Sequence, residues 1–253
     1  MKKIFLISSL GLALSACSHQ KIDLRTNLFM TPTVSDKVWS GHLEVVTTPQ
    51  TRITLTEDPS SNPPKRDNVR INEDLDFIDV LFPFQLLSLD AGLSIIKGLE
   101  VSLNGSVLGL KYQFLNHAKE TSWVAAAFLG AGSHSQDKNN SNDPLNTNGV
   151  VTTEADIKTA RAGLSLGYRY SNLTPYFSIV GERHEVESKI TNAHGVFENL
   201  KDQGHHYSAS LGISTSKKGL SAAIEYSLLR IDWERAEEKP LQSALGIRLG
   251  VAW

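Results

Sequence analysis

The end of the chain, residues 244–253, alternates between two kinds of side chain. Large apolar residues fill every second position up to Trp253, and the positions between them hold glycine, alanine and a single charged residue, Arg248. A period of two residues predicts a β-strand with two unlike faces. A strand on a water-soluble core would expose long polar side chains, whereas a face of small residues with one arginine suits a narrow barrel interior. The pattern therefore predicts a strand of a β-barrel, with its apolar side chains on the outer surface and its small side chains facing the lumen.

The same segment stops on an aromatic residue. This arrangement resembles the C-terminal assembly signal of bacterial outer-membrane β-barrels, carried here by Gly246, Leu249, Val251 and Trp253. The resemblance implies contact with outer-membrane lipids and with the barrel-assembly machinery as a partner.

Similar alternations of about ten residues recur through the chain, and that is the length a tilted membrane-spanning strand needs. Short polar connections alternate with long ones, which is typical of membrane barrels. We therefore predict an all-β fold, an antiparallel up-and-down transmembrane β-barrel of about ten strands, with eight or twelve left open. An even number would put both chain ends on the periplasmic side. The predicted strands are 37–57, 85–96, 99–104, 106–116, 121–134, 155–171, 174–187, 204–216, 219–233 and 241–253.

Two further features belong to this topology. Residues 71–84 have helical spacing of their apolar side chains and are predicted as a short helix or a strand extension.

Aromatic residues should gather at the two membrane interfaces, where rings with one polar edge are favoured. The aromatic residues at predicted strand ends are Trp39, Phe114, Trp123, Tyr168, Tyr170, Tyr176, Phe177, Tyr207, Trp233 and Trp253.

The N-terminus has the layout of an export signal. Two lysines precede an apolar run, and the sequence Leu-Ser-Ala follows immediately before Cys17, which is the only cysteine. This layout predicts a signal peptide over residues 1–16. The motif resembles the lipobox of bacterial lipoproteins, which implies lipidation of Cys17, the lipoprotein-sorting machinery as a partner and, with Ser18 next, the bacterial outer membrane as destination. Residues 17–36 are then predicted to be a lipidated tether and residues 37–253 the barrel.

Composition excludes several other classes. The chain has 25 Lys and Arg against 27 Asp and Glu, so no basic field favours a nucleic acid. One cysteine cannot build a disulfide framework or a thiolate zinc cluster. The longest apolar run covers residues 4–16, which is too short for a membrane-spanning helix.

Few side chains suggest catalysis or metal binding. His206 and Ser208 lie two residues apart, which resembles the His-x-Ser of outer-membrane lipid A deacylases, but Leu220 stands where that family has a glutamate. His205 and His206 could join His184 or His194 at a metal, yet adjacent strand residues point to opposite faces. We therefore predict no catalytic residue, no metal and no cofactor, and assign His206 and Ser208 to the filling of the lumen.

Eight charged residues are predicted to face the lumen, four acidic and four basic. Paired charges are tolerated in a tight interior, so we predict an ion-pair network that plugs the barrel, with all members except Arg161 and Glu182 placed towards the periplasmic end. Its members are Asp90, Glu100, Lys111, Arg161, Arg169, Glu182, Glu225 and Arg248.

The functional hypothesis is an outer-membrane barrel lipoprotein with a structural, surface-interaction or adhesion role, whose loop-binding partner the sequence does not identify. A narrow channel for a small solute or an apolar molecule is the alternative. A lipid-modifying barrel enzyme and a soluble periplasmic β-sandwich lipoprotein are less favoured.

Overall fold

A computed structural model describes residues 18–58, 65–72, 87–115, 121–139, 152–192, 195–217, 219–237 and 239–253. Ten antiparallel strands close into a barrel, with the last strand paired to the first strand of the wall. This confirms the predicted up-and-down transmembrane β-barrel of ten strands. The described part of the chain holds no helix long and apolar enough to cross a membrane. The wall consists of β2 (Gly41–Thr47), β5 (Leu87–Ile96), β6 (Leu99–Asn104), β7 (Val107–Leu115), β8 (Thr121–Asn139), β9 (Thr152–Tyr170), β10 (Leu173–Asn192), β11 (Gly195–Lys217), β12 (Leu220–Trp233) and β13 (Leu241–Ala252).

The barrel wall is apolar outside and polar inside, as β12 shows. Leu220, Ile224 and Leu228 face outward and are exposed, while Glu225 and Ser227 face the lumen and are fully buried. This is the reverse of a soluble protein and matches an exterior solvated by lipid. Further along β12 the next outward residue is Arg230, so an apolar band surrounds only the half of the barrel that contains the C-terminus.

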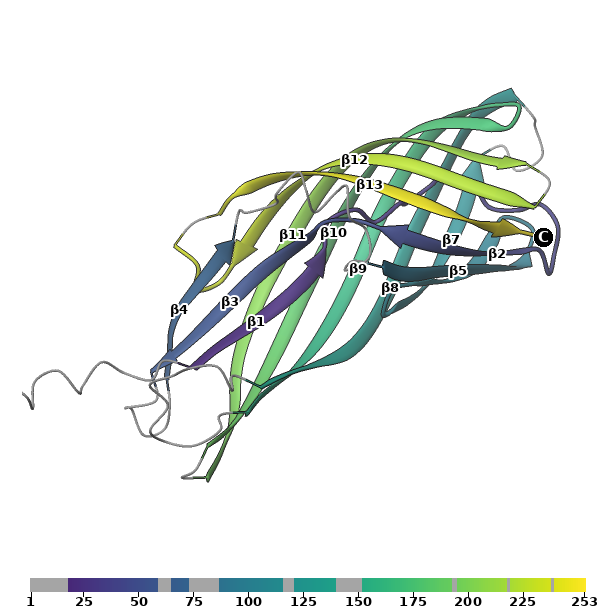
Figure 1. Ribbon diagram of the computed structural model, residues 1–253. Helices are drawn as coiled ribbons and strands as arrows, with labels where there is room; N and C mark the ends of the chain where they lie inside the picture. The colour runs from purple at the N-terminus through teal and green to yellow at the C-terminus, as the bar shows by residue number, and fades with distance from the viewer. Residues whose placement is uncertain are drawn as a thin grey trace, which may run out of the picture.

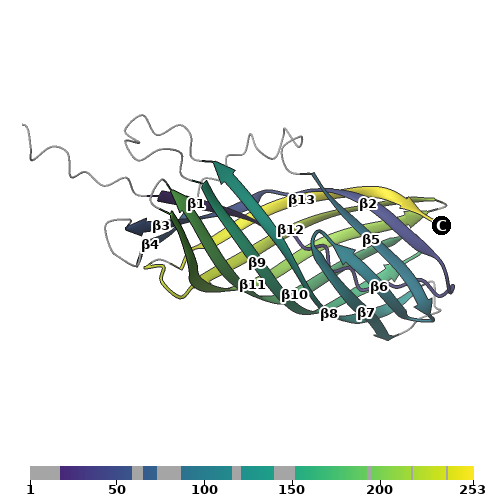
Figure 2. The same cartoon turned by 90° about the horizontal axis from the view of Figure 1, so that it is seen from below.

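Beyond the apolar band, β8 to β12 continue as a curved polar sheet (Figures 1 and 2). A second sheet with the order β1-β3-β4 packs against it; its strands are β1 (Ser18–Arg25), β3 (Gln50–Asp58) and β4 (Lys65–Asn72). We call the second sheet and the parts of β8 to β12 that it covers the head. Its core joins Ile22, Leu24, Ile53, Leu55 and Val69 of the second sheet to Ala155, Ile157, Val186, Leu229, Ile231 and Trp233.

The predicted strand 37–57 is wrong because the chain leaves the barrel wall in its middle. β2 ends at Thr47, and β3 starts at Gln50 in the second sheet. Pro49 lies between them, and proline has no N–H to donate to a sheet ladder. The strand therefore ends just before a residue that could not donate to the hydrogen-bonded ladder of the barrel wall.

The segment predicted as a tether is part of the fold. After β1 the chain runs through the barrel interior and emerges beside the C-terminus, where the Gly41 amide bonds the Trp253 carbonyl (Figure 2). We call residues 26–36 the plug. The described chain begins at Ser18 in the head and ends at Trp253 at the other end of the barrel (Figure 1). The expectation that both chain ends lie on one side is therefore wrong for the described chain.

Three further predictions concern strand bounds, residues 71–84 and the aromatic residues. Residues 188–203, which lie between the predicted strands 174–187 and 204–216, are largely strand, because β10 runs to Asn192 and β11 begins at Gly195. Most of 71–84 lies outside the described residues. Two of the ten aromatic residues are not at an interface: Tyr176 lies in the lumen and Trp233 in the head core.

Candidate functional site

One buried carboxylate of the barrel wall binds the backbone of the plug. Glu225 of β12 has no exposed surface, and its Oε1 accepts hydrogen bonds of 3.1 Å from the backbone amides of both Leu28 and Phe29. Its Oε2 accepts from the Tyr176 hydroxyl at 2.9 Å. Phe29 has a φ of 49°, a left-handed conformation that is costly for a bulky residue. Glu225 therefore holds the plug at its most strained point.

Side-chain and backbone groups of the plug also form hydrogen bonds with the wall. The Asn27 amide donates to the Glu225 carbonyl at 2.9 Å and to the Ser227 hydroxyl at 2.8 Å. The Val34 amide donates to Oε1 of Gln113, across the lumen on β7, at 2.7 Å. The plug thus spans the interior and satisfies wall groups that water would meet in an open channel.

The interior is shaped to admit this segment. A Cβ at Gly246 of β13 would come within 2.8 Å of Asn27 and of the Phe29 ring, and one at Gly167 of β9 would come within 2.8 Å of Pro32. A ten-strand lumen with small residues at such contacts accommodates one extended chain. Leu28 and Met30 pack against Val107, Phe128 and Val180.

Three of the predicted lumen charges lie towards the head. Asp90 bonds Arg25 of β1 at 2.8 Å and the side-chain amide of Asn104 at 2.8 Å. Arg161 of β9 bonds Glu182 of β10 at 2.7 Å and also donates to Asn104. These contacts join β1 to four strands of the wall at the base of the head.

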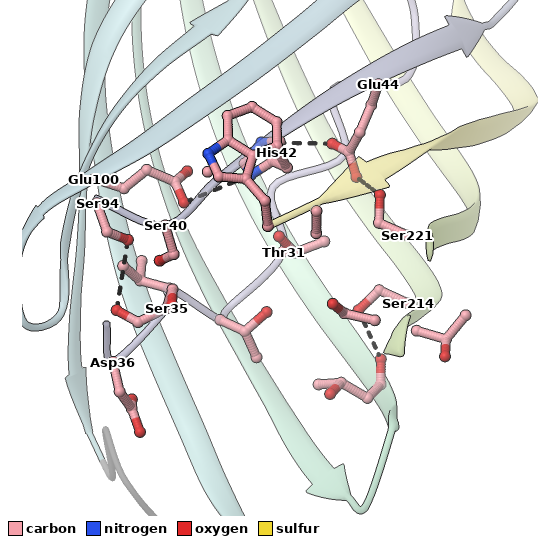
Figure 3. Close-up of a pocket in the computed structure, with 18 of the residues that line it drawn as sticks. Thr31, Ser35, Asp36, Ser40, His42, Glu44, Ser94, Glu100, Ser214 and Ser221 are labelled. Carbon is pink, nitrogen blue, oxygen red and sulfur yellow. Dashed lines mark hydrogen bonds and ion pairs between the residues drawn. The ribbon is translucent and has the colours of Figure 1, made fainter. Parts of the chain in front are cut away.

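The other charged pairs lie towards the C-terminal end of the barrel. Lys111 forms an ion pair with Glu100 at 2.8 Å, and Arg248 forms one with Glu44 of β2 at 3.2 Å. His42 lies between the two carboxylates, 3.5 Å from Glu44 and 3.8 Å from Glu100 (Figure 3). Arg248 also covers the Phe29 ring of the plug at 5.4 Å.

A cavity of about 680 Å³ lies between the plug and the C-terminal mouth of the barrel. Its charged lining includes the two ion pairs just described and His42. Arg169 lines it too, as do many hydroxyl groups, including Thr31, Ser35, Ser94 and Ser221 (Figure 3). The cavity is polar, and its inner end is occupied by the plug.

The structure thus buries seven of the eight predicted charges within the barrel and places Arg169, half-buried, at the cavity. They do not form one layer near one end, because Asp90 lies at the Asn104–Gly105 turn, opposite the Lys97–Gly98 turn of its hairpin. Glu225 pairs with the plug rather than with an arginine. The lumen is therefore filled by a chain segment as well as by side chains.

Sequence reasoning missed three partners of these charges. Glu44 could have been found, since it alternates with the outward Leu43 and Val45. Arg25 could not, because nothing in residues 17–36 indicated that they enter the barrel. Tyr176 was expected at the membrane interface, although its position on β10 places it inside.

The His-x-Ser pair faces inward, where both residues are buried. Ser208 pairs with Leu229 across the sheet, whereas the exposed Leu220 lies at the far end of β12. The arrangement of the deacylase resemblance is therefore not formed. His206 instead contacts His184, at 4.6 Å between ring centroids.

In the head, exposed charges pair across the strands. Lys201 and Lys158 lie 3.2 Å and 3.6 Å from Glu187. The hydrogen bond from Lys201 and the charge of Lys158 hold the pKa of Glu187 below its usual value. Such exposed pairs add little stability, and they leave the head with a hydrated surface.

Comparison with known proteins identifies similar folds but no family. No family model matches the chain, and no curated protein matches it. Among solved structures, Ail, the attachment invasion locus protein of Yersinia pestis, is similar with 10% identity and a TM-score of 0.38, over 86% of this chain and 100% of Ail. The outer membrane protease OmpT of Escherichia coli is similar with 8% identity and a TM-score of 0.34, over 94% of this chain and 95% of OmpT.

Proposed function

We propose that the protein is an outer-membrane β-barrel lipoprotein that holds a folded head at the cell surface for contact with other molecules. The occupied lumen carries this proposal, because the plug crosses the interior and is bonded to the wall through Glu225, Asn27 and Val34. A closed barrel that continues into a packed head suits display better than conduction. The closed barrel with its apolar exterior also removes the β-sandwich alternative.

Short turns at the C-terminal end of the barrel support an orientation with the head outside the cell. At the C-terminal end, the β5–β6 and β9–β10 turns contain two residues each, Lys97–Gly98 and Ser171–Asn172. Barrels of the outer membrane have short turns on the periplasmic side and longer extensions outside. The C-terminal strand, with Gly246, Leu249, Val251 and Trp253 as the assembly signal, would then end at the periplasm, with the head outside.

This orientation is tested by cysteine labelling on intact cells. Lys201→Cys places a thiol on the exposed surface of the head, and Asn172→Cys places one in a turn at the opposite end. A membrane-impermeant maleimide should label Lys201→Cys on intact cells and Asn172→Cys only after the outer membrane is permeabilised. The unsubstituted protein is the control for any reaction of Cys17. The reverse pattern would overturn the orientation.

Lipidation at Cys17 is part of the same proposal and is supported by the lipobox. Since Ser18 is the first residue of β1 in the head, acyl chains on the preceding residue would belong to the outer side of the membrane. That differs from the expectation that both chain ends lie on the periplasmic side.

Radiolabelled palmitate should enter the protein in growing cells, and Cys17→Ser should abolish the label, because Cys17 is the only cysteine. The measurement is autoradiography of the protein after immunoprecipitation. Equal labelling of both proteins, or labelling of neither, would contradict the proposal while leaving the barrel and its orientation untouched.

A further inference from the structure

Three ionisable side chains converge inside the barrel at the base of the head. Glu182 and His184 follow one another on the inward face of β10, and His206 of β11 is the cross-strand neighbour of Glu182. All three are buried, with 6%, 2% and 1% of their surface exposed. One possible ligand atom from each lies within 4.8 Å of the other two. The sequence had offered His184 and His206 only together with His205, which points to the outer face, and no metal was predicted.

Both imidazoles have one nitrogen satisfied and one without a hydrogen bond. His184 Nδ1 lies 3.0 Å from the Thr159 hydroxyl, and His206 Nε2 accepts from the Trp233 indole at 3.2 Å. Within the described residues, His184 Nε2 and His206 Nδ1 are buried with no hydrogen-bond partner. A buried polar atom left unpaired is costly, so these two nitrogens require an explanation.

The two carboxylate oxygens of Glu182 also differ in their partners. Its Oε1 bonds the Arg161 guanidinium through two nitrogens, each at 2.7 Å. Its Oε2 lies 3.9 Å from the unpaired Nε2 of His184. One carboxylate oxygen thus lies near an unpaired imidazole nitrogen, and a ring nitrogen of His206 completes a group of three ligand atoms within 4.8 Å of one another.

We propose that Glu182, His184 and His206 bind a divalent transition-metal ion, for which zinc fits the ligands best. Zinc accepts histidine nitrogen at about 2.0–2.1 Å together with carboxylate oxygen. Magnesium and calcium prefer all-oxygen sites. Thr159 contacts His184 and Arg161 contacts Glu182. Residues that bond to metal ligands in this way orient the ligating side chains and tune metal affinity. The ion would join β10 to β11 where the head meets the apolar band.

Metal binding at His206 Nδ1 has a consequence for Trp233. In a neutral imidazole one nitrogen carries the proton, and His206 Nε2 accepts from Trp233, so the proton resides on Nδ1. A metal on Nδ1 requires that proton to move to Nε2, which then no longer accepts from the indole. The Trp233 hydrogen bond is lost, and the fluorescence emission of Trp233 should shift on metal addition.

The test measures zinc bound to purified full-length protein in detergent, after refolding with zinc and removal of the free metal. His184→Gln and His206→Gln should each lose the stoichiometric zinc retained by the unsubstituted protein. His205→Gln is the matched control, since it changes the adjacent histidine on the opposite face of β11. Thr159→Val keeps the side-chain shape and should weaken zinc binding about 10–100-fold.

Heat-modifiable migration on a gel verifies that each variant forms the barrel. If the two histidine variants fail to fold, the unsubstituted protein and Thr159→Val still decide the matter. Zinc should raise the unfolding temperature and shift the tryptophan emission of the unsubstituted protein and of His205→Gln. No retained zinc and no shift in the folded protein, or equal zinc in His206→Gln and His205→Gln, would overturn the site.

Discussion

Replacing Glu225 with alanine should turn a closed barrel into one that conducts ions. The substitution removes the acceptor for the Leu28 and Phe29 amides and for the Tyr176 hydroxyl. Each buried donor left without an acceptor costs about 1–3 kcal/mol, and the strained backbone of Phe29 loses its support. The plug should then leave its position for part of the time. Single-channel recording in planar bilayers measures the result.

The unsubstituted protein should show no steady conductance, and Glu225→Ala should show resolvable openings. Glu225→Gln keeps one carbonyl oxygen for the plug amides and should open less often. Tyr226→Phe is the control, because Tyr226 is the next residue on β12 and faces outward. Large, steady openings of the unsubstituted protein would contradict the plug and favour the channel hypothesis.

Replacing Ile224 with arginine should prevent much of the protein from assembling into membranes. Ile224 is the central outward residue of the apolar stretch of β12, between Leu220 and Leu228, and is 55% exposed. An arginine at the bilayer midplane of a barrel costs about 2–4 kcal/mol, whereas near the interface it costs about 0–1 kcal/mol. The free energy of unfolding in lipid vesicles, measured by denaturant titration, should fall by the larger amount.

Leu220→Arg is the matched control for depth. Leu220 lies on the same face of the same strand and is equally exposed, at 59%, but it is at the end of the apolar stretch. It should assemble nearly normally. If the two variants lost equal stability, the apolar band would not be centred at Ile224, and the position of the barrel in the membrane would have to be revised.

The barrel could be predicted from the sequence because alternation carries the information locally. Leu249 and Arg248 are adjacent, and a strand must place them on opposite faces, so lipid and lumen sides follow without knowledge of any contact. The same rule correctly places Glu225, Glu182 and Arg161 inside. The ten strands of the wall agree with the predicted number, for which the sequence alone had left eight and twelve open.

Only the tertiary structure decided what fills the lumen and what lies beyond the membrane. The plug has no period, because Asn27, Leu28 and Val34 donate to separate groups on different wall strands rather than to one neighbouring strand. Contacts between residues about 200 positions apart, such as Asn27 with Ser227, depend on closure of the barrel. For the same physical reason, the meeting of His184 with His206 depends on the register of β10 against β11, which local alternation does not specify.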